Sequence, residues 1–296
     1  MPTREYIVKT NDYARAQLFP VRRKATGKRG KRNKPTRETQ EKLNQKNRER
    51  MLADILHLNY TDKDYFIRLS YSDENNPATI AEADAMLYNY FRRIRYLRKK
   101  QGLPPLKAVY VTEQGTKSGR IHHHVFLNGD IDRDTLEGLW KNGYANTRRL
   151  QFNEHGLVGL SKYCAKGKKA KEAKERQEET VARTWNTTRG LKRPQPNTEI
   201  FQNDYRVKAS DVAYIDEHPD DLRYIENLYP EYFVAAVETT PKEDYTEAET
   251  EVKSPIPQAR FITLFLYRRD AKLINTPYEN GGIKRDKKPT TTHKRR

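Results

Sequence analysis

The stretch 80–100 constrains the fold of this chain more than any other feature of its sequence. Its apolar residues recur every three or four positions and would line one face of a helix: Ile80, Ala83, Leu87, Phe91, Ile94 and Leu97. Thr79 and Glu82 form a capping box at its start, and arginines and lysines gather on its outer side and at its end. A helix with one apolar stripe must bury that stripe against another layer of structure.

Strand-like segments surround this helix. Residues 65–71, 106–113, 121–129 and 144–152 have the composition of strands, and a turn-rich connector predicts that the second and third form a hairpin. Further helices are predicted at 36–58, at 132–142 and from 157 through Tyr163. The order β-α-β-β-α-β-α with short connections predicts an α+β fold, an antiparallel sheet flanked by helices.

Composition divides the chain into four expected regions. Residues 1–62 are a basic arm and an N-terminal helix, 63–182 a folded core, 183–269 a C-terminal α/β accessory region, and 270–296 a basic disordered tail. Residues 183–196 have the composition of a loop, whereas 260–267 has the pattern of a strand that rejoins a sheet.

The formal net charge of +18 indicates a polyanionic partner, such as nucleic acid or an acidic membrane. Part of the excess lies in the Gly- and Pro-containing arm at 20–35, where we expect phosphate contacts from Arg22, Arg23, Arg29 and Arg32. A merely solubilising tail is the alternative. The single cysteine, Cys164, excludes an intramolecular disulfide and a cysteine-based zinc site. With no signal peptide and no long apolar stretch, we expect a soluble cytoplasmic protein without a membrane partner.

Three consecutive histidines lie in the segment 121–129. Strand alternation places His122 and His124 on one face, with Cα atoms about 7 Å apart, and turns His123 toward the other face. If the hairpin is in register, Glu113 lies opposite His122 on the same face. Two imidazoles and a carboxylate make a three-ligand site with open positions, which suits a catalytic divalent cation. A polar strand whose histidines bind nothing remains the alternative.

The run SKYCAK contains Tyr163 and Lys166, which share one face of a helix. A free phenol is a poor nucleophile, but a nearby ammonium or a polarised target lowers the barrier, and Lys166 can neutralise charge in the transition state. Three more lysines and an arginine near the two motifs are expected to hold DNA phosphates: Lys162, Lys168, Lys169 and Arg120. A helical tyrosine that only packs is the alternative interpretation.

Together these motifs resemble a known family. GRIHHHVFLNG is similar to the His-hydrophobic-His motif of the HUH endonucleases, SKYCAK resembles their catalytic-tyrosine helix, and YFIRLSY resembles their opening strand. Over roughly residues 40–195 the chain resembles rolling-circle replication initiators of bacterial single-stranded DNA phages, of the gene II protein kind, and similar proteins of integrated elements. The middle position of the motif is usually apolar, so His123 is a departure that leaves open which histidine pair binds metal.

The resemblance implies an RRM-like core that nicks single-stranded DNA at a replication origin, with Mg²⁺ or Mn²⁺ on His122 and His124, Tyr163 as nucleophile and Lys166 assisting. Some members carry a second tyrosine four residues earlier, where this chain has Gly159, so a single-tyrosine enzyme is expected. The sequence has no P-loop, so a separate helicase would work with it, beside a polymerase and a single-strand-binding protein of the bacterial host. The oligomeric state stays open.

Three rival interpretations remain. A relaxase or transposase of the same superfamily would share the chemistry but act on different DNA. A non-catalytic basic nucleic-acid-binding protein with an RRM-like sheet would lack it, although the sequence lacks the RRM aromatic signature. A structural zinc module would need a fourth ligand, which the sequence does not offer near the histidines.

Overall fold

Two antiparallel sheets organise the chain, in a computed structural model that describes residues 3–10, 12–20, 38–115, 118–165, 185–195, 201–239 and 261–270. The strands are β1 (Thr3–Lys9), β2 (Tyr13–Pro20), β3 (Tyr65–Tyr71), β4 (Ala108–Gln114), β5 (Ile121–Leu127), β6 (Gly143–Arg149), β7 (Asn186–Thr187), β8 (Phe201–Asp204), β9 (Tyr232–Thr239) and β10 (Ile262–Arg268). The helices are α1 (Glu38–Asn59), α2 (Ile80–Lys100), α3 (Arg133–Gly138), α4 (Val158–Cys164), α6 (Ala209–Glu217) and α7 (Leu222–Leu228).

Sheet B, with strand order β6-β3-β5-β4-β7, confirms the predicted α+β fold. From β3 to α4 the elements follow the predicted order β-α-β-β-α-β-α, which is compatible with an HUH or RRM-like core. Helix α2 buries its apolar stripe on one face of the sheet. At its start the Thr79 hydroxyl accepts a hydrogen bond from the Glu82 amide at 3.2 Å, whereas the Glu82 carboxylate accepts from Ala78 rather than from Thr79.

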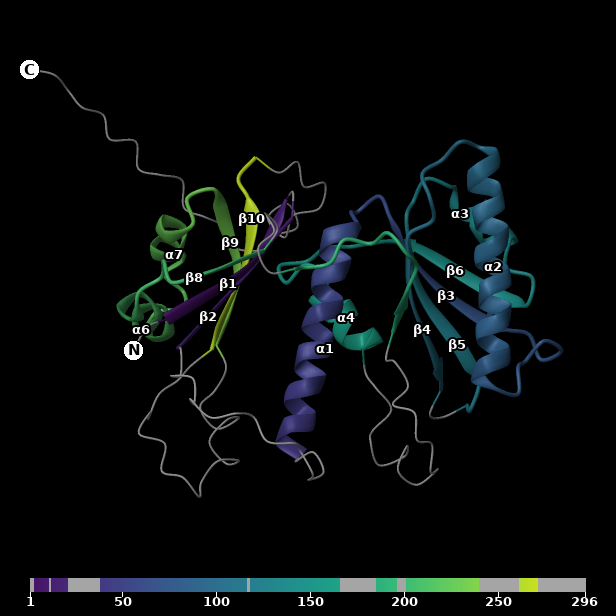
Figure 1. Cartoon of the computed structure of the whole chain (residues 1–296), viewed down its shortest axis with the longest axis horizontal. Coiled ribbons are helices and arrows are strands. Elements are labelled where there is room, and N and C mark those ends of the chain that lie inside the picture. Colours follow the sequence, from purple (N-terminus) through teal and green to yellow (C-terminus); the bar gives the residue numbers. More distant parts are fainter. Residues whose placement is uncertain are drawn as a thin grey trace, which may run out of the picture.

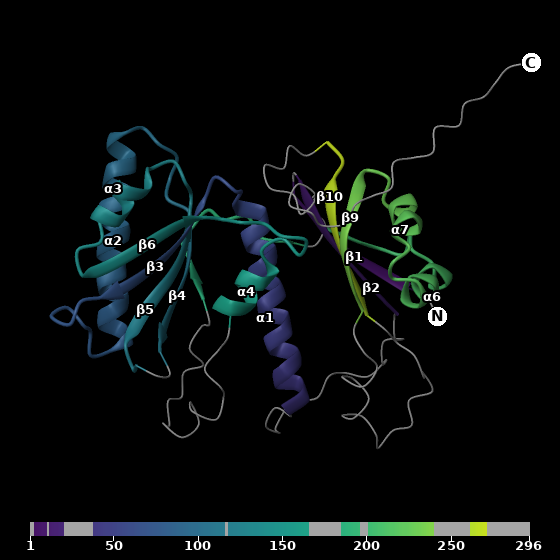
Figure 2. The same cartoon turned by 180° about the vertical axis from the view of Figure 1, so that it is seen from behind.

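The opposite face of sheet B packs against α1 and α4. Leu52, Ile55 and Leu56 of α1 are fully buried in one cluster with Val109 of β4 and Phe126 of β5. Helices α1 and α4 therefore lie between the two sheets (Figures 1 and 2). Helices α2 and α3 lie beyond sheet B, and α6 and α7 lie beyond the other sheet, sheet A, which contains β1, β2, β8, β9 and β10.

Sheet A, with strand order β8-β1-β2-β10-β9, was not expected as a second sheet. Its strands β1 and β2 lie in the first twenty residues, for which the sequence analysis predicted no strand. Residues Ala14, Ala16 and Leu18 of β2 face the α6–α7 core, whereas Tyr13 and Arg15 face α1. Small and charged residues thus alternate along β2, which gives a weak strand signal. The strand predicted at 260–267 is β10, and it joins this sheet.

Several predicted boundaries shift in the structure. Helix α3 is shorter than the predicted 132–142, and β6 ends at Arg149 instead of 152. Part of the predicted loop at 183–196 forms β7, which pairs with β4 and extends sheet B. The division into four regions remains a prediction, and the charged run after α4 and most of both basic arms lie outside the described residues. Among the described helices, none combines the length and the apolar content that crossing a bilayer requires.

Candidate active site

The register of the β4–β5 hairpin brings three possible metal ligands together. Glu113 pairs directly with His122, as predicted, and Val111 pairs with His124, so all of these side chains project from one face of sheet B. The potential ligand atoms of Glu113, His122 and His124 lie within 4.8 Å of one another. Glu113 Oε1 lies 3.1 Å from His122 Nε2 and 2.8 Å from His124 Nε2.

The surroundings keep this group charged and partly open. Burial alone would raise the pKa of Glu113, but hydrogen bonds and the charges of His122 and His124 outweigh it and lower the pKa to about 2. The His124 side chain is only 1% exposed, whereas Glu113 is 28% exposed. Phe66 of β3 stacks on the His124 ring at 5.5 Å and fixes its plane. A preoriented, anionic and solvent-reachable donor set of this kind can bind a divalent cation.

His123 lies on the opposite face of β5, as strand alternation predicts. Its side chain is fully buried, with Nε2 2.5 Å from the Tyr71 hydroxyl and Nδ1 2.9 Å from the Thr112 hydroxyl. Thr112 donates to Asp84 at 2.6 Å, so its oxygen accepts from His123 Nδ1. Burial, with the charges of the neighbouring histidines, lowers the pKa of His123 to about 3. These contacts give His123 a role in packing and separate it from the three clustered side chains.

Helix α4 places Tyr163 on the same side of sheet B as the cluster. The Tyr163 and His124 ring centroids are 5.1 Å apart, with an interplanar angle of 71°, and Tyr163 is 45% exposed. The apolar side of α4 is buried against α1 and sheet B through Leu157 and Cys164, which leaves the tyrosine at the open edge. A phenol, two imidazoles and a carboxylate therefore lie close together on one partly exposed part of this face.

Comparison with known protein families identifies the segment that builds this site. Residues 64–168 match the family model for the replication-associated protein ORF2/G2P. This segment of the chain is therefore similar to that family. The match runs from the start of β3 to just past α4 and is consistent with a gene II-like rolling-circle replication initiator. Neither the curated proteins nor the solved structures give a match to the chain.

The match to the ORF2/G2P family model implies DNA binding, so the positions of the other predicted site residues matter. Lys162 is exposed on α4 beside Tyr163. Arg120 forms an ion pair with Asp73 and donates to the Tyr71 carbonyl at 2.7 Å, so part of its guanidinium is already engaged. The remaining predicted residues lie outside the described part of the chain: Lys166, Lys168, Lys169, Arg22, Arg23, Arg29 and Arg32.

The sequence analysis missed two side chains that lie on the same face of sheet B as His122 and His124. Arg68 of β3 pairs with His124, and Ser70 pairs with both His122 and Tyr144. Arg68 and Tyr144 therefore share the face of the candidate metal-binding cluster, which consists of Glu113, His122 and His124. Arg68 is exposed, and Tyr144 is 73% exposed. The charged and polar positions that interrupt the apolar strand YFIRLSY were the available signal for Arg68.

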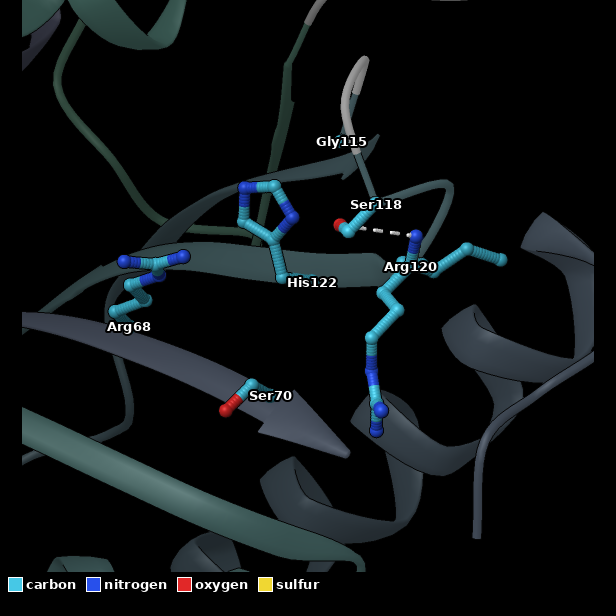
Figure 3. Close-up of a pocket in the computed structure, with 7 residues that line it drawn as sticks. Arg68, Ser70, Gly115, Ser118, Arg120 and His122 are labelled. Carbon is cyan, nitrogen blue, oxygen red and sulfur yellow. Dashed lines mark hydrogen bonds between the residues drawn. The ribbon is translucent and has the colours of Figure 1, made fainter. Parts of the chain in front are cut away.

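A shallow pocket of about 320 Å³ adjoins the cluster, and Arg68, Ser70, Arg120 and His122 are among the residues that line it. Figure 3 shows Arg68 and His122 rising from neighbouring strands to the same side, while Arg120 points away from them. Within the described residues the Arg68 guanidinium has no hydrogen-bond or ion-pair partner. The pocket therefore offers an available cation beside the candidate metal ligands.

Proposed function

We propose that this protein is a single-strand DNA endonuclease and strand transferase that nicks a replication origin to start rolling-circle replication. The observation that carries the proposal is the position of Tyr163, whose ring lies 5.1 Å from His124 within the Glu113–His122–His124 cluster. The family of residues 64–168 supports a role in replication initiation, which favours an initiator over a relaxase or transposase.

The metal would be held by His122, His124 and Glu113. Their donor atoms already converge, and the depressed pKa of Glu113 keeps that carboxylate anionic at neutral pH. We propose Mg²⁺ or Mn²⁺, which when bound would withdraw electron density from the scissile phosphate and offset its charge. The chain's own contribution is to preorient the three ligands on adjacent strands, where Phe66 stacking limits rotation of His124.

Tyr163 would be the nucleophile. Its phenolic oxygen attacks the phosphorus, an Oη–P bond forms and the P–O3′ bond breaks, which leaves a 5′-phosphotyrosine and a 3′-hydroxyl end. The phenol proton passes to water in the open site, and the departing 3′ oxygen takes up a proton. Lys166, three residues after Tyr163, would offset charge in the transition state. Attack by a 3′-hydroxyl on the phosphotyrosine reverses these steps and reseals DNA without ATP.

The uncovered part of sheet B would guide the DNA strand into the site. Arg68 and Lys162 flank the cluster and would contact phosphates, and the exposed ring of Tyr144 would stack on a base. With one tyrosine on α4 and Gly159 one turn earlier, the second cleavage that ends a round would require another subunit, water or another residue. Polymerase, helicase and single-strand-binding protein would be separate proteins in the cytoplasm of a bacterial host.

The test is covalent capture. A random-sequence single-stranded DNA library labelled at its 3′ end is incubated with the full chain and Mn²⁺, and products are separated on a denaturing protein gel. We expect label to migrate with the protein, and the captured strands to share one sequence at their cut 5′ ends. The matched control is Tyr163→Phe. Label retained by that variant would assign the nucleophile elsewhere, and no adduct from the wild-type chain with either metal would reject the proposed function.

A further inference from the structure

Helix α4 is held at both ends by α1. At its start the Leu157 amide donates to His57 Nε2 at 2.8 Å, and both groups are buried. Past its other end the Gln45 side-chain amide donates to the Ala165 carbonyl at 2.6 Å. Since α4 has only seven residues, it contributes little stability of its own, and its position depends on such contacts.

The turn before α4 fits closely against His57. Gly156 has a φ of 62°, and a Cβ added there would lie 2.2 Å from His57 Nε2. Glycine is therefore required for both its backbone conformation and the close approach of the imidazole. Burial, followed by the charge of Arg15, lowers the pKa of His57 to about 3, which keeps the ring neutral, so that its Nε2 can accept a hydrogen bond from an amide.

Sheet A holds this arrangement from the other side. The Tyr13 ring of β2 stacks on His57 with centroids 4.1 Å apart, and the Tyr267 hydroxyl of β10 donates to the Asn153 carbonyl at 2.8 Å. One turn of α1 away, Arg15 makes a buried bidentate ion pair with Asp54, with its shortest contact at 2.7 Å. Strands β2 and β10 thus contact α1 and the turn at once.

We infer that sheet A and α1 form a brace that holds the turn 153–157 and thereby positions α4 and Tyr163 beside the metal-binding cluster. His57 is the positioning residue at the centre of the brace. The inference rests on the proposed function only for the role of Tyr163. It assigns a purpose to strands that lie outside the family-matched residues 64–168, because β2 supplies the ring that stacks on His57 and β10 the hydroxyl that binds Asn153.

Two substitutions at His57 distinguish the effect of its hydrogen-bond acceptor from the effect of its aromatic ring. His57→Phe keeps an aromatic ring against Tyr13 but leaves the Leu157 amide without its acceptor, whereas His57→Gln restores an acceptor. Gly156→Ala disturbs the same contact from the other partner. The matched control is Tyr229→Phe, which removes a buried hydrogen bond to Glu5 on the far face of sheet A without touching the turn.

Hydrogen exchange in the metal-free protein tests the brace directly. We expect His57→Phe and Gly156→Ala to speed exchange over residues 153–165 by roughly tenfold, and His57→Gln and Tyr229→Phe to leave it near the wild-type rate. Unchanged exchange in His57→Phe, or equal acceleration in Tyr229→Phe, would overturn the brace. This readout needs neither DNA nor metal, so it decides the inference even if the wild-type chain forms no adduct.

Single-turnover adduct formation then tests positioning. A displaced nucleophile should slow the covalent step by roughly 10- to 100-fold in His57→Phe, with DNA and Mn²⁺ affinities unchanged, and His57→Gln should recover most of the rate. A rate equal to wild type in a variant whose turn has loosened would show that the brace does not position Tyr163. A parallel loss of DNA affinity would point to general unfolding and would likewise reject the positioning role.

Discussion

The rings of His124 and Tyr163 meet edge to face, with centroids 5.1 Å apart, although one residue comes from β5 and the other from α4. Because the two side chains have different chemical roles in the proposed mechanism, their substitution should separate metal binding from bond formation. The functional assignment depends on this separation.

His124→Ala should lower Mn²⁺ affinity by roughly 100-fold or more, since it removes a direct ligand rather than an outer partner. Tyr163→Phe should keep wild-type affinity yet form no covalent adduct. Free Mn²⁺ can be followed by electron paramagnetic resonance and the adduct by denaturing gel. Equal Mn²⁺ affinity in His124→Ala and wild type would contradict the ligand assignment.

Tyr144→Ala should weaken single-stranded DNA binding by about 1–3 kcal/mol, roughly 5- to 150-fold in Kd, because an exposed ring that stacks on a base is lost. Tyr96→Ala is the matched control. Tyr96 is 72% exposed on α2, which covers the opposite face of sheet B. Fluorescence anisotropy with a labelled oligonucleotide measures both variants, and equal weakening by the two would place the DNA elsewhere.

Arg68→Gln should make DNA binding less dependent on salt. Loss of one phosphate contact reduces the slope of log K against log salt concentration by about 0.7 for single strands. Titrations at four or more salt concentrations give the slope. Arg92→Gln, which removes an exposed arginine of α2, is the control and should leave the slope unchanged. The proposal fails for Arg68 if both slopes match that of the wild type.

Asp54→Ala should lower the free energy of unfolding by about 3–5 kcal/mol, because it leaves the Arg15 guanidinium buried without its counter-ion. The double variant Arg15→Met with Asp54→Leu should recover most of this loss, since no isolated charge remains. Urea denaturation monitored by circular dichroism measures both. A double variant no more stable than Asp54→Ala would show that the pair contributes more than mutual neutralisation.

Acid should begin to destabilise the protein below about pH 6.5, before its carboxylates start to titrate. Burial lowers the pKa values of His57 and His123 from 6.5 to about 3, so between these values the unfolded chain binds more protons than the folded one. Their contribution to stability is complete above pH 6.5 and falls as the pH drops toward 3, by up to about 1.4 kcal/mol per pH unit for each histidine. Urea midpoints at several pH values should give a shallower slope for His57→Phe. An unchanged slope would contradict the assignment.

Local sequence patterns predicted the hairpin that carries the three histidines and the helix α2 well. Strand alternation fixed which of the three histidines share a face, and the hairpin register placed Glu113 opposite His122. The apolar stripe and cap of 80–100 predicted α2 with its observed bounds. These features depend on residues close together in sequence, where periodicity and turn chemistry carry the information.

Long-range relationships were not predictable in the same way. Sheet A requires Leu18 of β2 to pair with Ile262 of β10, and nothing near either residue specifies its partner. The exposure of Arg68 and Tyr144 depends on which part of sheet B the helices α1 and α4 leave uncovered. The role of His57 depends on its contacts with Tyr13 and Leu157, which are both distant from it in the sequence.

The pairing of β2 with β10 also dictates an order of events during synthesis. Every element from β3 to α4 leaves the ribosome before β10 does, so these elements can fold while sheet A still lacks β10, the strand that joins β2 to β9. A nascent chain would therefore carry its candidate metal ligands early and gain a firmly positioned Tyr163 only after β10 has been made. Premature cutting of DNA by incomplete polypeptides would be avoided without any dedicated inhibitor.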